Sequence, residues 1–191
     1  MLMSTVRKTK LSPQEYLALE RKAENKSEYY DGEVFAFTGA SRPHNLIVVN
    51  VLTMFNTQLR SRPSQVYPSH MRVKVSATGL YTYPDITVVC GEPEVEDEFL
   101  DTLLNPTVIV EVLSPSTEHA DRVVKFAQYR RLLSVKEYVL IAQDSVRLEH
   151  YGRQDDGRWL LTEYSDPEQI TTLGSIECEL RLKDIYDKVV N

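Results

Sequence analysis

The sequence predicts an α/β fold with a central mixed β-sheet flanked by helices, and three observations lead to this fold class. Apolar runs of strand length recur in the middle of the chain, and residues 108–113 are rich in valine, as strands covered on both faces usually are. Segments with helical periodicity lie between such runs. The strands follow one another first as a meander and then through a helical crossover, so we expect a mixed sheet and not a regularly alternating, doubly wound one.

The first element is predicted to be a helix that begins after Ser12. Ser12 suits the N-cap, Pro13 the first helical position and Glu15 the third, and together they form a capping box. We expect this helix to extend to about Ala23.

A hairpin and a long helix are expected next. The dipeptide Asp31-Gly32 is typical of a tight turn and should join strands at residues 28–30 and 33–38. A helix is then predicted over residues 43–60, because apolar residues recur on one face there and polar residues cover much of the other.

The rest of the chain alternates between apolar runs and turn-forming residues, with one further long helix. We expect strands at residues 66–75, 84–90, 107–113, 137–141, 146–151 and 159–164, and helices at residues 118–133 and from about residue 183.

Length and composition indicate one globular domain over residues 1–191. The chain is long enough to build a core without disulfide or metal staples, and 42% hydrophobic with 26% charged residues is ordinary for a soluble protein. Cys90 and Cys178 are far apart in sequence, which favours reduced thiols in a cytosolic protein. No apolar run suggests a signal peptide or a membrane span. We therefore expect a cytoplasmic protein with no membrane partner.

The net charge of −6 argues against tight non-specific binding to nucleic acid, although metal-binding carboxylates can coexist with a local basic patch. Much of the acid lies between Glu92 and Asp101, in a predicted exposed loop. The densest basic run could contact phosphates or form a solvated helix face. It contains Arg122, Lys125, Arg130, Arg131 and Lys136.

Two carboxylates stand in apolar strand contexts and form the first candidate site. Glu111 lies in the middle of the run over residues 108–113, and Asp85 precedes another apolar run. Burying a carboxylate costs several kcal/mol unless it is paired, hydrogen-bonded or metal-bound, so the two acids together predict a divalent-metal site. The alternatives are a structural ion pair for Glu111 and a turn at the start of a strand for Asp85.

Five motifs in a fixed order strengthen this interpretation, because any one of them alone is weak. They are Glu28-Tyr29-Tyr30-Asp31-Gly32-Glu33, Ser41-Arg42-Pro43-His44-Asn45, Pro84-Asp85-Ile86, Val110-Glu111-Val112-Leu113-Ser114-Pro115-Ser116-Thr117, and Asp121, Lys125 and Tyr129 at intervals of four. Across residues 11–186 the chain resembles the Uma-type family of restriction-endonuclease-like proteins, within the PD-(D/E)XK nuclease superfamily.

The resemblance implies Mg²⁺- or Mn²⁺-dependent hydrolysis of DNA by a restriction-endonuclease-like core, and often a homodimer. Asp85 and Glu111 would be the metal ligands and Glu28 would help to position a water or a second metal. The superfamily lysine normally stands two residues after the glutamate, where this chain has Leu113. The resemblance supplies Lys125 on the following helix as its replacement.

Simpler interpretations remain open for several of these residues. Lys125 could lie on a solvated helix face, and Glu28 could form a cross-strand pair in the first hairpin. His44 is most simply a helix-start residue, with a catalytic or metal role as the alternative. The remaining histidines lack zinc-site spacing. A non-catalytic DNA-binding or homo-oligomeric scaffold protein that keeps the fold is the alternative to an enzyme.

Overall fold

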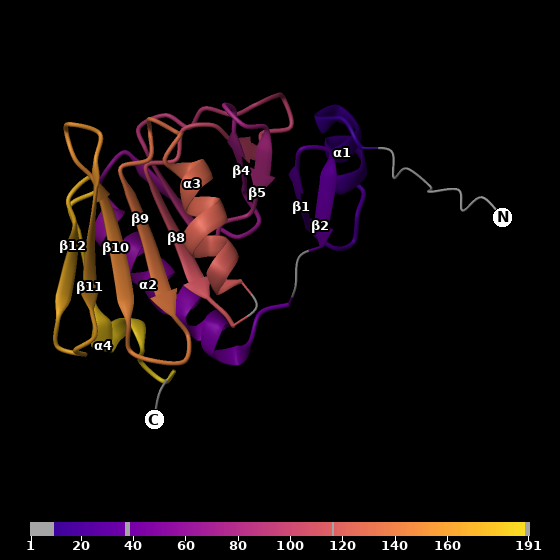
Figure 1. Ribbon diagram of the computed structural model, residues 1–191. Coiled ribbons are helices and arrows are strands. Elements are labelled where there is room, and N and C mark those ends of the chain that lie inside the picture. The colour runs from indigo at the N-terminus through magenta and orange to yellow at the C-terminus, as the bar shows by residue number, and fades with distance from the viewer. Residues whose placement is uncertain (1–9, 37–38, 116, 190–191) are drawn as a thin grey trace.

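The computed structural model describes residues 10–36, 39–115 and 117–189, and its largest element is a six-stranded sheet (Figure 1). The strand order is β11-β10-β9-β8-β6-β3. Strands β8 and β9 are parallel, and every other neighbouring pair in this sheet is antiparallel. The predicted mixed sheet is therefore confirmed. Its strands are β3 (Ser64–Pro68), β6 (Ile86–Cys90), β8 (Val108–Leu113), β9 (Glu137–Ala142), β10 (Leu148–Arg153) and β11 (Trp159–Tyr164).

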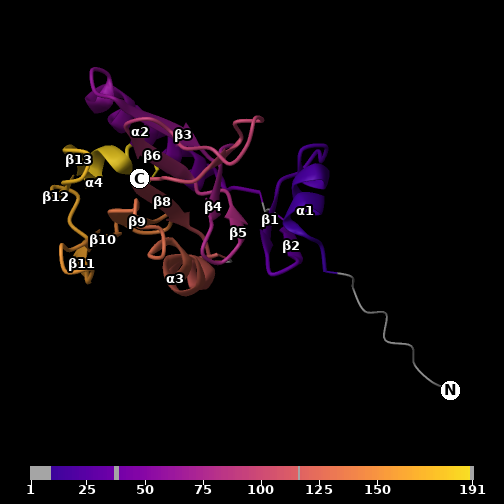
Figure 2. The ribbon, with the colours of Figure 1, turned by 90° about the horizontal axis from the view of Figure 1, so that it is seen from above.

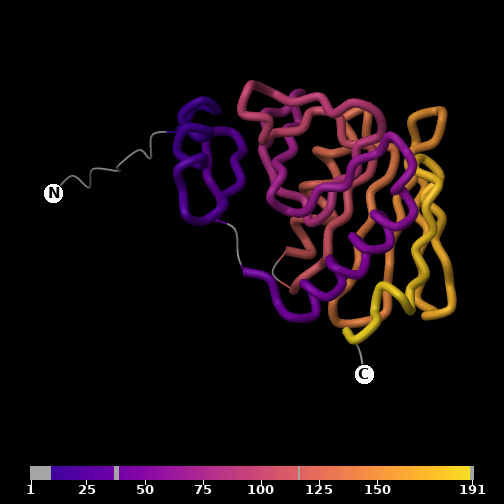
Figure 3. Tube along the Cα trace, turned by 180° about the vertical axis from the view of Figure 1, so that it is seen from behind, coloured from indigo at the N-terminus to yellow at the C-terminus, as the bar shows by residue number. Residues whose placement is uncertain are grey.

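Helices cover both faces of this sheet. Helix α2 (Arg42–Leu59) lies against one face, and the helical segment made of η1 (Ala120–Lys125) and α3 (Phe126–Tyr129) lies against the other (Figure 2). Seen from behind, α2 runs across the strands (Figure 3). Its buried apolar face joins the larger of two main apolar clusters, which includes Ile47, Val51 and Phe55.

The side-chain alternation of β8 explains why its sequence is apolar throughout. Val108, Val110 and Val112 belong to the cluster on the α2 face, whereas Ile109 and Leu113 belong to the cluster on the α3 face. Because successive strand residues point to opposite faces, Glu111 lies in the same row as Ile109 and Leu113. The strand therefore aims its carboxylate toward the η1–α3 segment.

A second sheet contains the N-terminal hairpin and has the order β2-β1-β5-β4-β7. Three tyrosine rings, those of Tyr16, Tyr29 and Tyr81, pack together with centroid distances of 5.0–5.9 Å and join the N-terminal elements to β5. The elements of this region are α1 (Pro13–Glu20), β1 (Ser27–Tyr30), β2 (Glu33–Ala36), β4 (Arg72–Val75), β5 (Leu80–Thr82) and β7 (Thr102–Leu103).

The C-terminal region packs on the α2 face of the large sheet. It forms a hairpin of β12 (Ile170–Leu173) and β13 (Cys178–Arg181), followed by α4 (Leu182–Ile185). Buried residues of all three elements belong to the same apolar cluster as α2. A fully buried hairpin face thus completes the second layer beside the helix.

Several predicted boundaries are wrong for identifiable reasons. The strand expected at residues 66–75 is two strands, β3 and β4, in different sheets, because Pro68 has no N–H to continue the ladder and a turn follows it. The predicted capping box of Ser12 and Glu15 is confirmed, but α1 ends at Glu20. The sequence reasoning missed β5, β7, β12 and β13. Of the predicted strand at residues 33–38, the last two residues lie outside the described part of the chain.

The helix predicted over residues 118–133 differs most in its local geometry. It contains a stretch of wide π turns, in which the N–H of Phe126 reaches back to the carbonyl of Asp121, and it ends at Tyr129. Such wide turns are rare and often occur at functional sites. Here they carry both Asp121 and Lys125.

Candidate active site

The two sequence-predicted carboxylates meet at one end of the large sheet. Strands β6 and β8 pair antiparallel with Ile86 opposite Val110, and one further step in this register sets Asp85 opposite Glu111, on the same face. The backbone N–H of Asp85 lies 3.4 Å from Glu111 Oε2. This edge is also the carboxyl end of the parallel pair β8–β9, where the sites of α/β proteins usually form.

Asp85 is held through one of its two carboxylate oxygens. Asp85 Oδ2 accepts a hydrogen bond from the backbone N–H of Val112 at 2.7 Å and lies 3.1 Å from His44 Nε2. Within the described residues no donor contacts Oδ1. The carboxylate is therefore fixed in place while one oxygen stays available to a ligand.

Glu111 is held mainly through one carboxylate oxygen by two residues of the η1–α3 segment. Its Oε1 accepts from the hydroxyl of Tyr129 at 3.0 Å and from Lys125 Nζ at 3.2 Å. Its Oε2 has only the long contact from the Asp85 N–H. As with Asp85, one oxygen is well bonded and the other retains most of its capacity to accept.

Lys125 stands at the centre of three carboxylates and is not on a solvated helix face. Its Nζ lies 3.2 Å from Glu111 Oε1, 3.2 Å from Asp121 Oδ1 and 3.3 Å from Glu28 Oε1, and its side chain is only 15% exposed. Lys125 therefore lies within hydrogen-bond reach of Glu111 at the site.

Glu28 is brought to the site by the first hairpin, although it belongs to the other sheet. Its Oε1 accepts from the hydroxyl of Thr82 at 2.6 Å and from the N–H of Tyr83 at 3.3 Å. Glu28 therefore contacts residues next to Asp85 in sequence as well as Lys125. The simpler expectation of a cross-strand pair within the hairpin does not describe these contacts.

Two residues of this site were not among the predicted site residues, although a catalytic or metal role for His44 was an alternative. Asp121 is 2% exposed and pairs with Lys125, and the interval of four between them was the signal that could have identified it. His44 is both a helix-start residue, with its N–H donated to Ser41 Oγ, and a direct neighbour of Asp85. Its motif position gave the signal, but only the fold brings α2 to this edge.

Burial and mutual repulsion shift the titration of these groups. Burial raises the pKa of Glu111 well above its usual value, and the nearby Asp121, Asp85 and Glu28 raise it further against the opposing effect of Lys125. Burial also raises the pKa of Asp121. Burial lowers the pKa of Lys125, but the carboxylates of Glu111, Glu28 and Asp121 outweigh it and hold this pKa well above the usual value.

The charge balance of the cluster fits a divalent cation. Four carboxylates, those of Glu28, Asp85, Glu111 and Asp121, face one lysine and a histidine that is charged only when protonated. In the described part of the chain no three acidic, histidine or cysteine side chains converge to enclose a metal ion. Mg²⁺ takes one or two protein carboxylates and completes its shell with other oxygens, so two carboxylates such as Asp85 and Glu111 would be enough for it.

The predicted basic run does not form a single exposed face. Arg122 contacts the carboxylates of Glu118 and Glu149, and Lys125 is committed to the site. The acidic loop over residues 92–101 is likewise not made only of unpaired carboxylates, because Asp97 and Asp101 both form ion pairs with Arg21.

Comparison with known proteins identifies the family. The model of the Uma2 family, described as "Putative restriction endonuclease", matches residues 13–183. The chain belongs to the Uma2 family. The resemblance drawn from the five sequence motifs is thereby confirmed, and restriction-endonuclease-like proteins generally use a divalent metal ion.

Two relatives and one solved structure are similar to this chain over most of its length. The uncharacterized proteins slr1290 and sll1609 of Synechocystis sp. are 36% and 38% identical over 167 and 162 residues. The matches cover 86% and 84% of this chain and 87% and 92% of the relatives. A crystal structure from Anabaena variabilis, described as a putative nuclease, has a TM-score of 0.77 at 19% identity and covers 94% of this chain and 99% of its own. That likeness confirms the nuclease-like fold.

In residues 10–36, 39–115 and 117–189, no helix has the length and apolar character to cross a membrane.

Proposed function

We propose that this Uma2 protein is a Mg²⁺- or Mn²⁺-dependent endonuclease that hydrolyses phosphodiester bonds of DNA. The observation that carries the proposal is the meeting of Asp85 and Glu111 from neighbouring strands beside one buried lysine, Lys125. Membership of a family described as restriction endonucleases supports the reaction class. DNA as the partner, a homodimer and a cytoplasmic location are parts of the same proposal.

Asp85 and Glu111 are the residues that would hold the metal ion. Their less occupied oxygens, Oδ1 and Oε2, belong to side chains whose other oxygens are already hydrogen-bonded, and the carbonyl of Val112 could supply a third oxygen. When bound, the ion would lower the pKa of a coordinated water and neutralise charge on the scissile phosphate.

The protein's own groups position these ligands before any substrate arrives. The N–H of Val112 and the ring of His44 restrain Asp85, and the hydroxyl of Tyr129 restrains Glu111. Such preorganisation matters because a carboxylate that must reorient during the reaction adds to the barrier.

Lys125 is the group proposed to act on the reacting atoms. Its ammonium has three N–H donors, and the surrounding carboxylates keep it protonated. It can orient the attacking water or donate to the negative charge that develops on the phosphate. Glu28 and Asp121 hold the lysine at the edge of the sheet and thus replace the positional control that an in-strand lysine would have.

The test is cleavage of supercoiled plasmid DNA with Mg²⁺ or Mn²⁺. Asp85→Ala should lose both metal binding and cleavage. Lys125→Ala should lower the cleavage rate by about 10²-fold or more while it still binds the metal, because a transition-state contact is removed. Asp101→Asn, outside the site, is the matched control and should cleave normally. Circular dichroism with metal present verifies that each variant is folded.

Two outcomes would contradict the proposal. A fully active Lys125→Ala protein would show that the lysine has no part in the chemistry. Failure of the wild-type protein to cut any DNA with either metal would favour the non-catalytic alternative.

A further inference from the structure

A second cluster of polar side chains lies in a cavity of about 590 Å³ that shares no lining residue with the candidate active site. The cavity is bounded by strands β9, β10 and β11 and by the turn between β12 and β13. Glu137 pairs with Val108 in the sheet and lies three residues before Leu140, which pairs with Glu111. Because Val108 belongs to the cluster on the α2 face, the Glu137 side chain also points to that face. The cavity volume is within the range of small-molecule sites.

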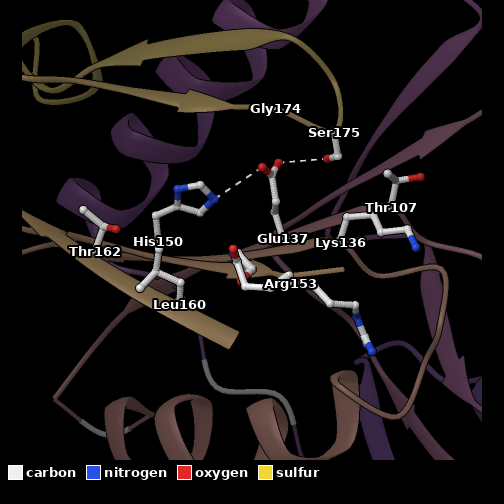
Figure 4. Close-up of a pocket in the computed structure, with 11 residues that line it drawn as sticks. Thr107, Lys136, Glu137, His150, Arg153, Leu160, Thr162, Gly174 and Ser175 are labelled. Carbon is white, nitrogen blue, oxygen red and sulfur yellow. Dashed lines mark hydrogen bonds and ion pairs between the residues drawn. The ribbon is translucent and has the colours of Figure 1, made fainter. Parts of the chain in front are cut away.

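The floor of this cavity is a buried carboxylate. Glu137 is 6% exposed; its Oε2 accepts from the hydroxyl of Ser175 at 2.8 Å and its Oε1 lies 3.4 Å from His150 Nε2. Figure 4 shows Glu137 pointing between His150 and Ser175. Within the described residues no lysine or arginine nitrogen lies within 4.0 Å of this carboxylate. A buried carboxylate without a permanent cation is costly, so the site favours a cationic ligand.

The space above Glu137 is open because the residue opposite it, Gly152, has no side chain. Gly152 lies directly opposite Glu137 in the β9–β10 register, and a glycine inside a strand often marks the close approach of a ligand. A Cβ on Gly152 would meet no atom closer than 3.8 Å, and the two it approaches are His150 Nε2 and Gln154 Nε2. A larger side chain at this position would therefore enter the cavity without straining the strand.

Two basic residues line the cavity, but their charged groups point away from Glu137 (Figure 4). Lys136 Nζ donates to the carbonyl of Leu133 at 3.2 Å, and Arg153 donates to the carbonyls of Val135, Arg130 and Leu132 at 2.8 Å. In the described part of the chain neither cation has a carboxylate partner. Val135 and Leu132 belong to the apolar cluster on the α3 face, whereas Glu137 lies on the α2 face. These two cations therefore do not face the Glu137 carboxylate.

A metal ion is a poorer match than an organic cation. Among the described residues no third histidine, cysteine or carboxylate joins Glu137 and His150, and zinc sites in proteins use at least three such ligands.

We propose that this cavity binds a small organic cation whose guanidinium or ammonium group pairs with Glu137. Gly152 provides the room for it, and Ser175 and His150 orient the Glu137 carboxylate. The proposal does not rest on the nuclease function, because the cavity and the Asp85–Glu111 edge share no residue.

The test is an NMR titration of the ¹⁵N-labelled full-length protein with L-arginine. L-citrulline, which has nearly the same shape but no guanidinium charge, is the ligand control. Arginine should produce saturable shifts at the amides of Gly152, Gly174 and Ser175, with an affinity at least about tenfold higher than that of citrulline, as the loss of one charge-assisted contact implies.

Two variants remove the site in different ways. Glu137→Gln removes the charge of the floor, and Gly152→Val fills the cavity while Glu137 stays intact; both should lose the arginine shifts. Glu163→Gln is the matched control on an exposed residue of β11 and should bind arginine as the wild type does. If Glu137→Gln fails to fold, Gly152→Val decides. Equal shifts with arginine and citrulline, no saturable shift with arginine, or wild-type affinity in Gly152→Val would overturn the proposal.

Discussion

Asp101 and Glu111 both contact a partly or fully buried cation, yet their pKa values move in opposite directions. Hydrogen bonds from Arg21 and Arg72, together with their charges, hold the pKa of Asp101 below its usual range despite partial burial. Burial and neighbouring carboxylates raise the pKa of Glu111 despite the contact with Lys125. The same chemical group is therefore stabilised as an anion in one region and destabilised in the other.

The difference comes from the count of charges in each region. The clamp, defined as Arg21, Arg72, Asp97 and Asp101, contains two guanidinium groups and two carboxylates and ties α1 to the loop before β7. In the active-site cluster Lys125 contacts three carboxylates, and a fourth, that of Asp85, lies beside Glu111. A balanced group needs no further partner, whereas an unbalanced one favours a bound cation. Excess carboxylate thus distinguishes a candidate functional site from a structural ion pair.

The largest expected effect is the loss of the one lysine in the unbalanced cluster. Lys125→Met should lower the free energy of unfolding of the metal-free protein at pH 8 by about 3–5 kcal/mol, because three carboxylates lose their shared cation. Urea denaturation measures the change. The loss should shrink at pH 6 or with Mn²⁺, since protonation or metal relieves the repulsion.

Arg21→Met in the clamp is the matched comparison for that prediction. Asp101 keeps Arg72 as a partner, so the loss should be smaller and should not respond to Mn²⁺. Equal losses in both variants, or a Lys125→Met loss that metal leaves unchanged, would contradict the distinction between the two regions.

The pH dependence of stability gives the next largest effect. A carboxyl whose pKa is raised in the folded state binds more protons there than in the unfolded chain, so stability falls as pH rises above the usual range of Glu. The raised pKa of Glu111 therefore predicts that metal-free wild-type protein becomes less stable between pH 5 and pH 8. Glu111→Gln should flatten this dependence. Chemical denaturation at each pH measures the free energy of unfolding of both proteins. Parallel pH profiles for the two proteins would show that Glu111 does not titrate as expected.

The smallest expected effect belongs to the clamp and has the opposite sign. A lowered pKa contributes stability that is present above the usual Asp range and is lost as pH falls below it. Asp101→Asn should cost about 1 kcal/mol or less at pH 7, because the side chain is 32% exposed and water screens the pair. The difference between the variant and the wild type should shrink as pH falls below the usual Asp range and should vanish only below the lowered pKa of Asp101. A difference that stays constant as pH falls would argue for lost packing instead of lost charge.

The sequence was enough to predict the parts of the fold that depend on local patterns. The β8 run, the Ser12 capping box and the long α2 helix follow from apolar periodicity and helix-start chemistry, and all three are confirmed. The break at Pro68 and the short strands β5 and β7 were missed, because edge pairings of two to four residues depend on distant partners.

The residues of the candidate site also divide into those that local sequence could identify and those that only the assembled fold brings together. Asp85 and Glu111 could be identified because a carboxylate in an apolar strand contradicts the local pattern. Lys125 and Glu28 came from the family resemblance, since their neighbours Asp121 and Thr82 become adjacent only when the helix and the two sheets are assembled. His44 required the fold as well, because only tertiary packing brings the start of α2 to Asp85.

The central claim is that the Asp85–Glu111 edge binds a divalent metal ion, and calorimetric titration with Mn²⁺ tests it most directly. Wild-type protein and the clamp variant Asp101→Asn should each bind one ion with the same affinity. Glu111→Gln should remain folded and show no detectable binding, because it removes one of the two ligand carboxylates. Unchanged Mn²⁺ affinity and stoichiometry in Glu111→Gln would contradict the claim and leave Glu111 as the buried partner of Lys125.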